Sequence, residues 1–208
     1  MGQIKAVVFD IGRVLIEWHP ERFYDSEIGI EQRRAFFAAV DIYSMNERID
    51  MGAPFRETVY AFAETHPEYS AEIRLWHDSW IKMAAPEISG SVRLLRAIRA
   101  KGIPVFALSN FGIGTFETAA KHYPFFNEFD QKYVSGHLQE MKPHARIYEL
   151  LEQGSGLSPT SLLFTDDMRE NIDAAATRGW NTHQFDGPDG WANALVQHEV
   201  LTPEEAMV

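Results

Sequence analysis

Short apolar runs recur along the chain, and several end in polar residues. The first run, Ala6 to Phe9, is continuous rather than alternating, which is typical of a strand buried on both faces of a parallel sheet. From residue 87 onward, strand-like and helix-like patterns alternate, which predicts a doubly wound α/β domain. The further strands expected are 105–108, 133–134, 162–164 and 182–185, and the helices between and after them are 91–101, 115–122, 145–153, 168–178 and 191–197.

The stretch between the first and second predicted strands has only helical periodicity. Its apolar residues recur at a spacing of three and four, as in Ile73, Trp76, Trp80 and Met83. The helices expected there are 20–28, 30–40, 54–66 and 70–83. We therefore expect a helical cap over residues 17–87, inserted into an α/β core made of residues 1–16 and 88–208.

Composition excludes several classes of function. A net charge of −11 without a Lys/Arg cluster argues against binding nucleic acid or an anionic membrane. With no cysteine, the chain has no disulfide, thiolate metal site or thiol nucleophile. No signal peptide or long apolar run is evident, so we expect a cytoplasmic protein, monomer or homodimer, with a small-molecule substrate.

Polar residues follow four of the apolar runs or lie a little beyond them. These are Asp10, Ser109-Asn110, Lys142 and Asp166-Asp167. In an open parallel sheet the carboxyl ends of the strands converge on one crevice. Carboxylates gathered there repel one another unless a cation lies among them, and oxygen ligands suit Mg²⁺. A lysine and a hydroxyl beside that cation would complete a site for a phosphoryl group. For Asp10 alone, capping of the next turn is an equally good interpretation.

These motifs, in this order and spacing, resemble the haloacid dehalogenase (HAD) superfamily, most of whose members are Mg²⁺-dependent phosphatases. The resemblance covers the whole chain and implies a Rossmann-like core with an inserted helical C1 cap. It is closest to a subgroup of bacterial sugar-phosphate phosphatases that includes α-glucose-1-phosphatase. The motifs are Phe9 to Leu15, Leu108-Ser109-Asn110, Lys142-Pro143 with Ile147-Tyr148, and Phe164 to Asp167 with Asn171.

The resemblance implies a covalent mechanism. Asp10 would attack phosphorus and form an aspartyl-phosphate that water then hydrolyses. Ser109 and the backbone amide of Asn110 would hold phosphoryl oxygens, and Lys142 would offset the negative charge.

The resemblance also implies a metal site. Asp167, Asp10 and the carbonyl of Gly12 would bind Mg²⁺, with Asp166 assisting directly or through another ligand. Asn171 would orient a metal-bound water or Lys142.

The residue two places after Asp10 departs from the family pattern. Most of these phosphatases have an Asp there that acts as general acid and base, whereas this chain has Gly12. Loss of a positioned acid costs on the order of a hundredfold or more with a poor leaving group. We expect either a substrate with an acidic leaving oxygen, such as an anomeric or acyl phosphate, or a substitute acid, with Glu17 and His19 the nearest candidates.

Two alternatives to a phosphatase remain open. A 2-haloacid dehalogenase would fit Ser109-Asn110, but those enzymes lack the paired acidic site that Asp166-Asp167 presents. A catalytically degenerate binding protein would fit Gly12. Halide release without Mg²⁺ would favour the first, and inactivity toward a broad phosphate panel would favour the second.

Several cap residues have both a functional and a structural interpretation. Arg48 is a candidate for binding a second anionic group of the substrate, although a solvated surface charge is the better explanation. Aromatic residues could line a sugar pocket, but at helical spacing they more often form core. The aromatic candidates are Trp18, Phe23, Tyr43, Trp76 and Trp80.

Overall fold

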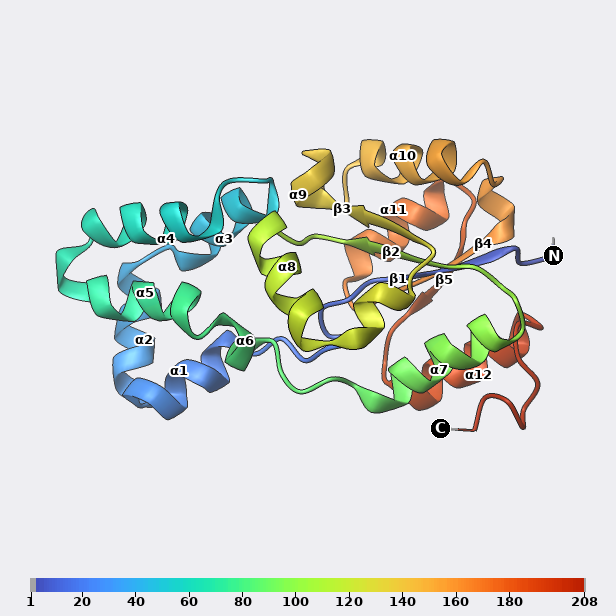
Figure 1. The fold of residues 1–208 in the computed structure, drawn as a ribbon, viewed down its shortest axis with the longest axis horizontal. Helices are drawn as coiled ribbons and strands as arrows, with labels where there is room; N and C mark the ends of the chain where they lie inside the picture. The colour runs from blue at the N-terminus through green and yellow to red at the C-terminus, as the bar shows by residue number, and fades with distance from the viewer. Residues whose placement is uncertain (1–2, 208) are drawn as a thin grey trace.

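The centre of the protein is a five-stranded parallel sheet with the strand order β3-β2-β1-β4-β5 (Figure 1). The computed structural model describes residues 3–207. Side chains of β1 alternate between two apolar clusters, Val7 and Phe9 in one and Ala6 and Val8 in the other. The continuous apolar run is therefore explained by burial on both faces. The strands are β1 (Ala6–Phe9), β2 (Val105–Ser109), β3 (Gln131–Val134), β4 (Leu162–Asp166) and β5 (Asn181–Gln184).

Helices cover both faces of this sheet, which confirms the doubly wound α/β fold expected from the sequence. Side chains of α7 and α12 pack in the cluster that holds Val7 and Phe9, whereas those of α10 and α11 pack in the cluster on the opposite face. The helices of this part are α7 (Ser89–Ala100), α8 (Ile113–His122), α9 (Ser135–Leu138), α10 (Ala145–Ser155), α11 (Arg169–Thr177) and α12 (Pro188–Gln197), with 3₁₀ turns η2 (Pro124–Glu128) and η3 (Pro159–Ser161).

The segment between β1 and α7 is helical and forms the lobe to the left of the sheet in Figure 1. Its apolar side chains belong to the same cluster as those under β1, so the lobe and one face of the sheet share a continuous core. Its elements are α1 (Pro20–Ile28), α2 (Ile30–Ala39), α3 (Ile42–Asp50), α4 (Phe55–Glu64), η1 (Pro67–Tyr69), α5 (Ser70–Asp78) and α6 (Trp80–Met83).

The lobe differs from the sequence expectation in two places. The helix expected over 70–83 is interrupted at Ser79, which divides it into α5 and α6. Helix α3 was not expected, because its exposed face is strongly polar. Its buried face consists of Ile42, Met45 and Ile49, and the Asp41 side chain caps it by accepting a hydrogen bond from the Ser44 amide at 3.0 Å.

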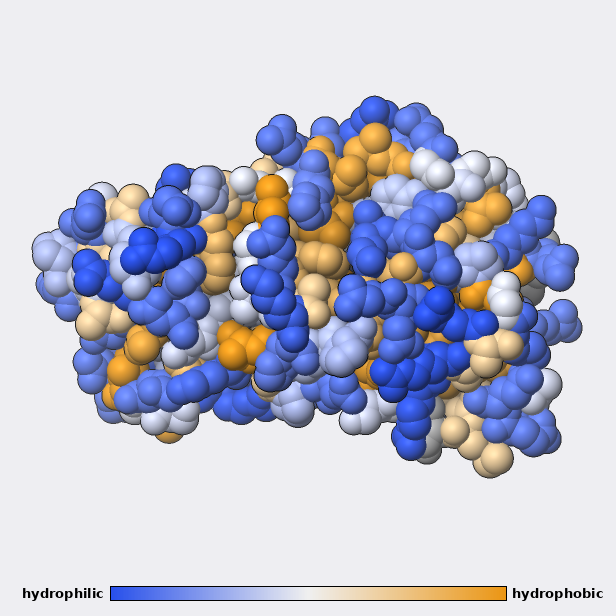
Figure 2. Space-filling model, viewed as in Figure 1, coloured by the Kyte–Doolittle hydropathy of each residue, from blue (hydrophilic) through white to orange (hydrophobic). Residues whose placement is uncertain are grey.

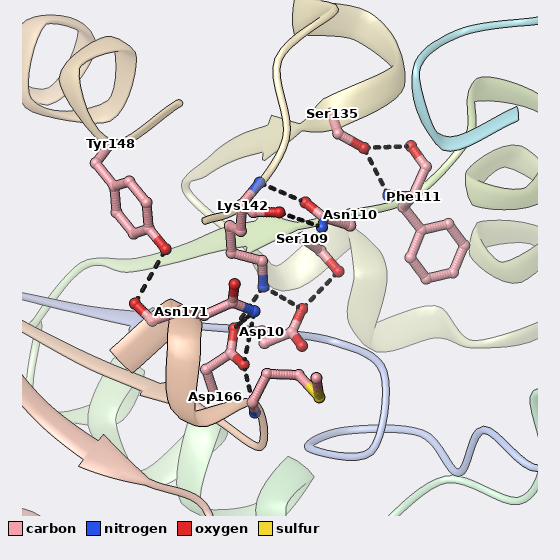
Figure 3. Close-up of polar contacts among 10 residues, drawn as sticks. Asp10, Ser109, Asn110, Phe111, Ser135, Lys142, Tyr148, Asp166 and Asn171 are labelled. Carbon is pink, nitrogen blue, oxygen red and sulfur yellow. Dashed lines mark hydrogen bonds and ion pairs between the residues drawn. The ribbon is translucent and has the colours of Figure 1, made fainter. Parts of the chain in front are cut away.

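The end of α3 packs closely against the α/β part. The Ser135 hydroxyl donates to the carbonyl of Asp50 at 2.6 Å. It also accepts from the Phe111 amide at 2.8 Å (Figure 3). Gly52 has a φ of +100°, and a Cβ there would lie 2.6 Å from the carbonyl oxygen of Gly136. We call this contact between residues 49–52 and residues 111–112 and 135–136 the α3 joint.

Within residues 3–207, we find no helix with the length and apolar character needed to cross a bilayer. The face seen in Figure 2 is mostly hydrophilic, with smaller apolar areas between α9 and α10.

Candidate active site

Asp10 lies directly after β1, at the carboxyl end of the central strand. Its backbone amide donates to the carbonyl of Thr165 at 3.0 Å, which aligns it with the end of β4. The residue is 7% exposed, and its Oδ1 accepts hydrogen bonds from the Ser109 hydroxyl at 2.6 Å and from Lys142 Nζ at 2.9 Å. Both contacts involve the same oxygen, so Oδ2 takes no part in either (Figure 3). Burial raises the pKa of Asp10, while Lys142 acts in the opposite direction.

Lys142 is held between two carboxylates. Its Nζ lies 2.6 Å from Asp166 Oδ2 as well as 2.9 Å from Asp10 Oδ1, and the residue is 3% exposed. Burial alone would lower the pKa of Lys142, but the carboxylates of Asp10 and Asp166 outweigh it and raise the pKa, so the amine stays charged. The Asn110 side chain fixes the lysine backbone by donating to its carbonyl at 2.9 Å and accepting from its amide at 2.8 Å.

Asp166 is fully buried and fully engaged with protein donors. Besides Lys142, it accepts from the Met168 amide at 2.8 Å and from Asn171 Nδ2 at 3.0 and 3.1 Å. This arrangement suits holding Lys142 better than ligating a cation directly. Asn171 thus contacts Asp166 rather than Lys142, and its own Oδ1 is buried without a hydrogen-bond partner.

The carboxylates of this site could hold a divalent cation. Asp10, Asp166 and Asp167 each offer a ligand atom within 4.8 Å of the others. Burial and the neighbouring Asp166 raise the pKa of Asp167, whose Oδ2 lies 3.6 Å from the guanidinium of Arg13. Three carboxylates exceed one buried ammonium in charge, and the unpartnered Asn171 Oδ1 could accept from a water ligand. The donor set therefore fits Mg²⁺.

A cavity of about 310 Å³ opens between this cluster and the helical lobe. The α/β part contributes the polar end, with Asp10, Ser109, Asn110, Lys142, Asp167 and Asn171. The lobe side contributes Trp18, Asn46, Asp50 and Trp80, and Gly12 and Arg13 also line the cavity.

The structure brings together most of the residues that the sequence singled out, but three of them lie elsewhere. Arg48 is exposed on α3 and does not line this cavity. Glu17 and His19 pair with each other, Oε2 to Nε2 at 2.5 Å, and are also outside the lining. The expectation that these three reach the substrate is therefore not supported by their positions.

The candidate aromatic residues divide between cavity and core. Trp18 and Trp80 line the cavity, whereas Trp76 is fully buried and Phe23 is 5% exposed in the core. Tyr43 is 47% exposed and lies outside the lining.

Sequence reasoning missed one carboxylate in the cavity, Asp50. It is partly buried at the end of α3, and its Oδ2 accepts from Asn46 Nδ2 at 2.8 Å. Trp76 Nε1 in turn donates to Asn46 Oδ1 at 3.0 Å. Burial raises the pKa of Asp50 to about 8, against a hydrogen bond from the Gly112 amide. The sequence feature that could have indicated Asp50 is its i, i+4 spacing from Asn46, because a helix places two such residues on one face.

The parallel sheet, the helical lobe after β1 and this arrangement of carboxylates and lysine are those of a hydrolase of the HAD type. The family model described as haloacid dehalogenase-like hydrolase matches residues 4–179, and the chain belongs to this family.

The individual relatives are distant. Enolase-phosphatase E1 of Yersinia pestis is 28% identical over 139 residues, which cover 66% of this chain and 49% of that protein. The chain thus matches about half the length of this curated relative.

Two solved structures illustrate the range of the fold. HAD family enzyme BT-2542 from Bacteroides thetaiotaomicron, in complex with magnesium and inorganic phosphate, superposes with a TM-score of 0.69 at 22% identity, covering 88% of this chain and 95% of that chain. L-2-haloacid dehalogenase from Xanthobacter autotrophicus gives a TM-score of 0.62 at 18% identity, covering 96% and 85%. At these identities the likeness concerns the fold.

Proposed function

We propose that this protein is a Mg²⁺-dependent phosphatase that hydrolyses a small phosphorylated metabolite through an aspartyl-phosphate on Asp10. The observation that carries the proposal is the environment of the Asp10 carboxylate. Lys142 and Ser109 bind one oxygen of this carboxylate. The other oxygen takes part in neither contact, and Asp10 lines the cavity. A carboxylate oriented in this way is suited to attack phosphorus.

In this proposal each residue of the cluster has a definite role. Asp10 Oδ2 bonds to phosphorus, and the leaving oxygen departs on the opposite side. Lys142 offsets the charge of the carboxylate and of the phosphoryl group, while Asp166 and Asn110 keep it in position. Ser109 orients the nucleophile in the free enzyme, and we propose that it and the amide of Asn110 hold phosphoryl oxygens when substrate binds.

The proposed cation site consists of Asp10, Asp167 and the carbonyl of Gly12, with Asp166 supporting it. A bound Mg²⁺ would supply positive charge toward the phosphoryl oxygens. Asn171, with its unpartnered Oδ1, is suited to hold a water of that site.

The cavity also bears on substrate class. Its lobe side combines the flat apolar faces of Trp18 and Trp80 with the polar groups of Asn46 and Asp50. Aromatic faces and paired polar groups both suit a sugar ring, so sugar phosphates are the first class to test. We propose that residues 17–87 act as the cap that encloses this leaving group.

A dehalogenase-type reaction is the alternative, because haloacetate dehalogenase H-2 of Moraxella is 30% identical over 95 residues, 46% of this chain. The geometry of Asp167 favours the phosphatase. Asp167 adds a third carboxylate beside Asp10 and Asp166, which a reaction without a cation does not require.

The test is a panel of metabolite phosphates with Mg²⁺ or with EDTA, run on the wild-type chain and on Asp10→Asn. We expect phosphate release that needs Mg²⁺ and falls by at least about a thousandfold in Asp10→Asn, because the amide cannot serve as the nucleophile. A parallel assay measures halide release from chloroacetate and 2-chloropropionate. Halide release with EDTA and no phosphate release with Mg²⁺ would contradict the proposal.

A further inference from the structure

We infer that Asp50 of helix α3 is the proton donor to the leaving oxygen, in place of the carboxylate that Gly12 lacks. This inference rests on the proposed phosphatase activity of the same site. It names a catalytic residue on the cap side of the cavity.

Asp50 and Asp10 line the cavity from different parts of the fold. Asp10 approaches phosphorus from the carboxyl end of β1, with Ser109 and Lys142 beside it. In-line displacement sends the leaving oxygen away from the nucleophile, toward the lobe that faces the sheet across the cavity. Asp50 and Asn46 line that side.

The other titratable residues in the lining have other roles or hold their protons. Asp10 is the nucleophile, Asp167 lies in the proposed cation site, and Arg13 does not release a proton in proteins. Lys142 is held by two carboxylates. Among the described lining residues, Asp50 is the carboxylate left with no assigned task.

Hydrogen bonds hold Asp50 in place. Asn46, itself fixed by the indole of Trp76, donates to its Oδ2, and Ser135 donates to its backbone carbonyl. The carboxyl is thus attached to the α/β part through the α3 joint. Its raised pKa, near 8, keeps it protonated at neutral pH, as a general acid requires.

The proton balance is complete. As Asp10 Oδ2 bonds to phosphorus, the bond from phosphorus to the leaving oxygen breaks, and its electron pair takes the proton of Asp50. In the second half, water attacks the same phosphorus and gives a proton to the Asp50 carboxylate. The bond to Asp10 breaks, and its electron pair restores the Asp10 carboxylate, so that inorganic phosphate and a protonated Asp50 result.

No close contact requires the glycine at position 12. A Cβ at Gly12 would meet no heavy atom within 4 Å. At least an alanine side chain would fit there, so no clash at the Cβ accounts for the absence of the usual carboxylate.

The test compares esters that differ in their need for a proton. Wild type, Asp50→Asn and the control Glu57→Gln are assayed with Mg²⁺ on p-nitrophenyl, phenyl and benzyl phosphate. Glu57 is an exposed carboxylate of α4 outside the cavity. For Asp50→Asn we expect kcat/KM to fall about a hundredfold on benzyl phosphate and less than about fivefold on p-nitrophenyl phosphate, whereas Glu57→Gln is unchanged.

A second measurement uses only the wild-type chain, in case the variant folds poorly. The rate on benzyl phosphate should fall as pH rises through about 8, and dependence on leaving-group acidity should steepen there. The charged groups that share this cavity are Asp10, Arg13, Lys142 and Asp167, and Glu47 lies on the same helix.

The outcomes separate this inference from the proposed function. An equal loss on all three esters in Asp50→Asn, or no loss, would overturn the assignment of Asp50 while activity that depends on Asp10 still stands. A wild-type enzyme inactive on every phosphate ester would overturn the proposed function and this inference with it.

Discussion

Two of the carboxyl groups that line the cavity, those of Asp10 and Asp50, lie in different surroundings. Burial raises the pKa of Asp10 to about 6, but the ammonium of Lys142 and the hydroxyl of Ser109 lie within hydrogen-bond distance and favour its ionised form. Asp50 has only Asn46 and the Gly112 amide to set against its burial, so its pKa rises to about 8. Environments that separate two carboxyl groups in this way assign one to act as nucleophile and the other as acid.

The raised pKa of Asp50 predicts a stability effect that is independent of catalysis. Between its unfolded value near 3.8 and its folded value near 8, the folded protein binds one proton more than the unfolded chain. The stabilisation is therefore present at low pH and is lost as pH rises, by up to about 1.4 kcal/mol per pH unit. The side chain faces a cavity, so this slope is an upper limit.

Urea unfolding of wild type and Asp50→Asn at several pH values measures this effect. The difference in free energy of unfolding, variant minus wild type, should grow from pH 5 to pH 8 and then level off. Glu57→Gln should show no such trend. A difference that is constant across this range would contradict the raised pKa.

At the scale of elements, helix α3 connects the lobe to the site. Its buried face packs through Ile42, Met45 and Ile49, and its last turn meets the α/β part at the α3 joint. Gly52 makes that approach possible, because a side chain there would contact the backbone of Gly136. Displacing the joint would move Asp50 with it.

Replacement of Gly52 by alanine should therefore impair both stability and activity. Gly29→Ala is the matched control, because Gly29 also has a positive φ, +84° against +100°, but a Cβ there meets nothing within 4 Å. Each variant should lose about 1 kcal/mol from the backbone conformation alone. Only Gly52→Ala should also reduce kcat on benzyl phosphate, by about tenfold or more. Equal kinetics in the two variants would show that the joint does not position the acid.

The elements that the sequence predicts well are those with a strong local pattern. The strand that ends at Asp10 and the motifs after β2 and β4 follow from short apolar runs closed by polar residues. Asp50 could not be found in this way, because its helix is polar on one face. Its place in the site depends on a contact between Ser135 and Asp50, 85 residues apart in the sequence. The same limit applies to Arg48, whose charge suggested a ligand but whose position on α3 is exposed.

At the scale of the whole molecule, one apolar cluster extends from beneath β1 into the lobe. It includes Phe9 of the central strand, Trp191 of α12 and Trp76 of α5. The cap expected over residues 17–87 therefore shares its interior with the core, although it is a separate lobe in Figure 1. Shared burial of this kind couples the two parts when the protein unfolds.

We therefore expect a single cooperative unfolding transition. Far-UV circular dichroism should give one transition in urea, and hydrogen exchange should give similar opening free energies for segments 55–78 and 162–177. Exchange measured by mass spectrometry resolves the two segments. A lobe that opens at clearly lower free energy than the sheet would contradict this coupling.

The close approach of Gly52 to Gly136 has a consequence for selectivity. If the α3 joint is what positions the proton donor against the leaving oxygen, then protonation requires close contact between the helical lobe and the α/β part. A bulky leaving group that holds them apart would still place its phosphate beside Asp10 but would depart without a proton. The enzyme would then discriminate by size in its turnover number rather than in its affinity, and oversized esters would act as slow, competing ligands.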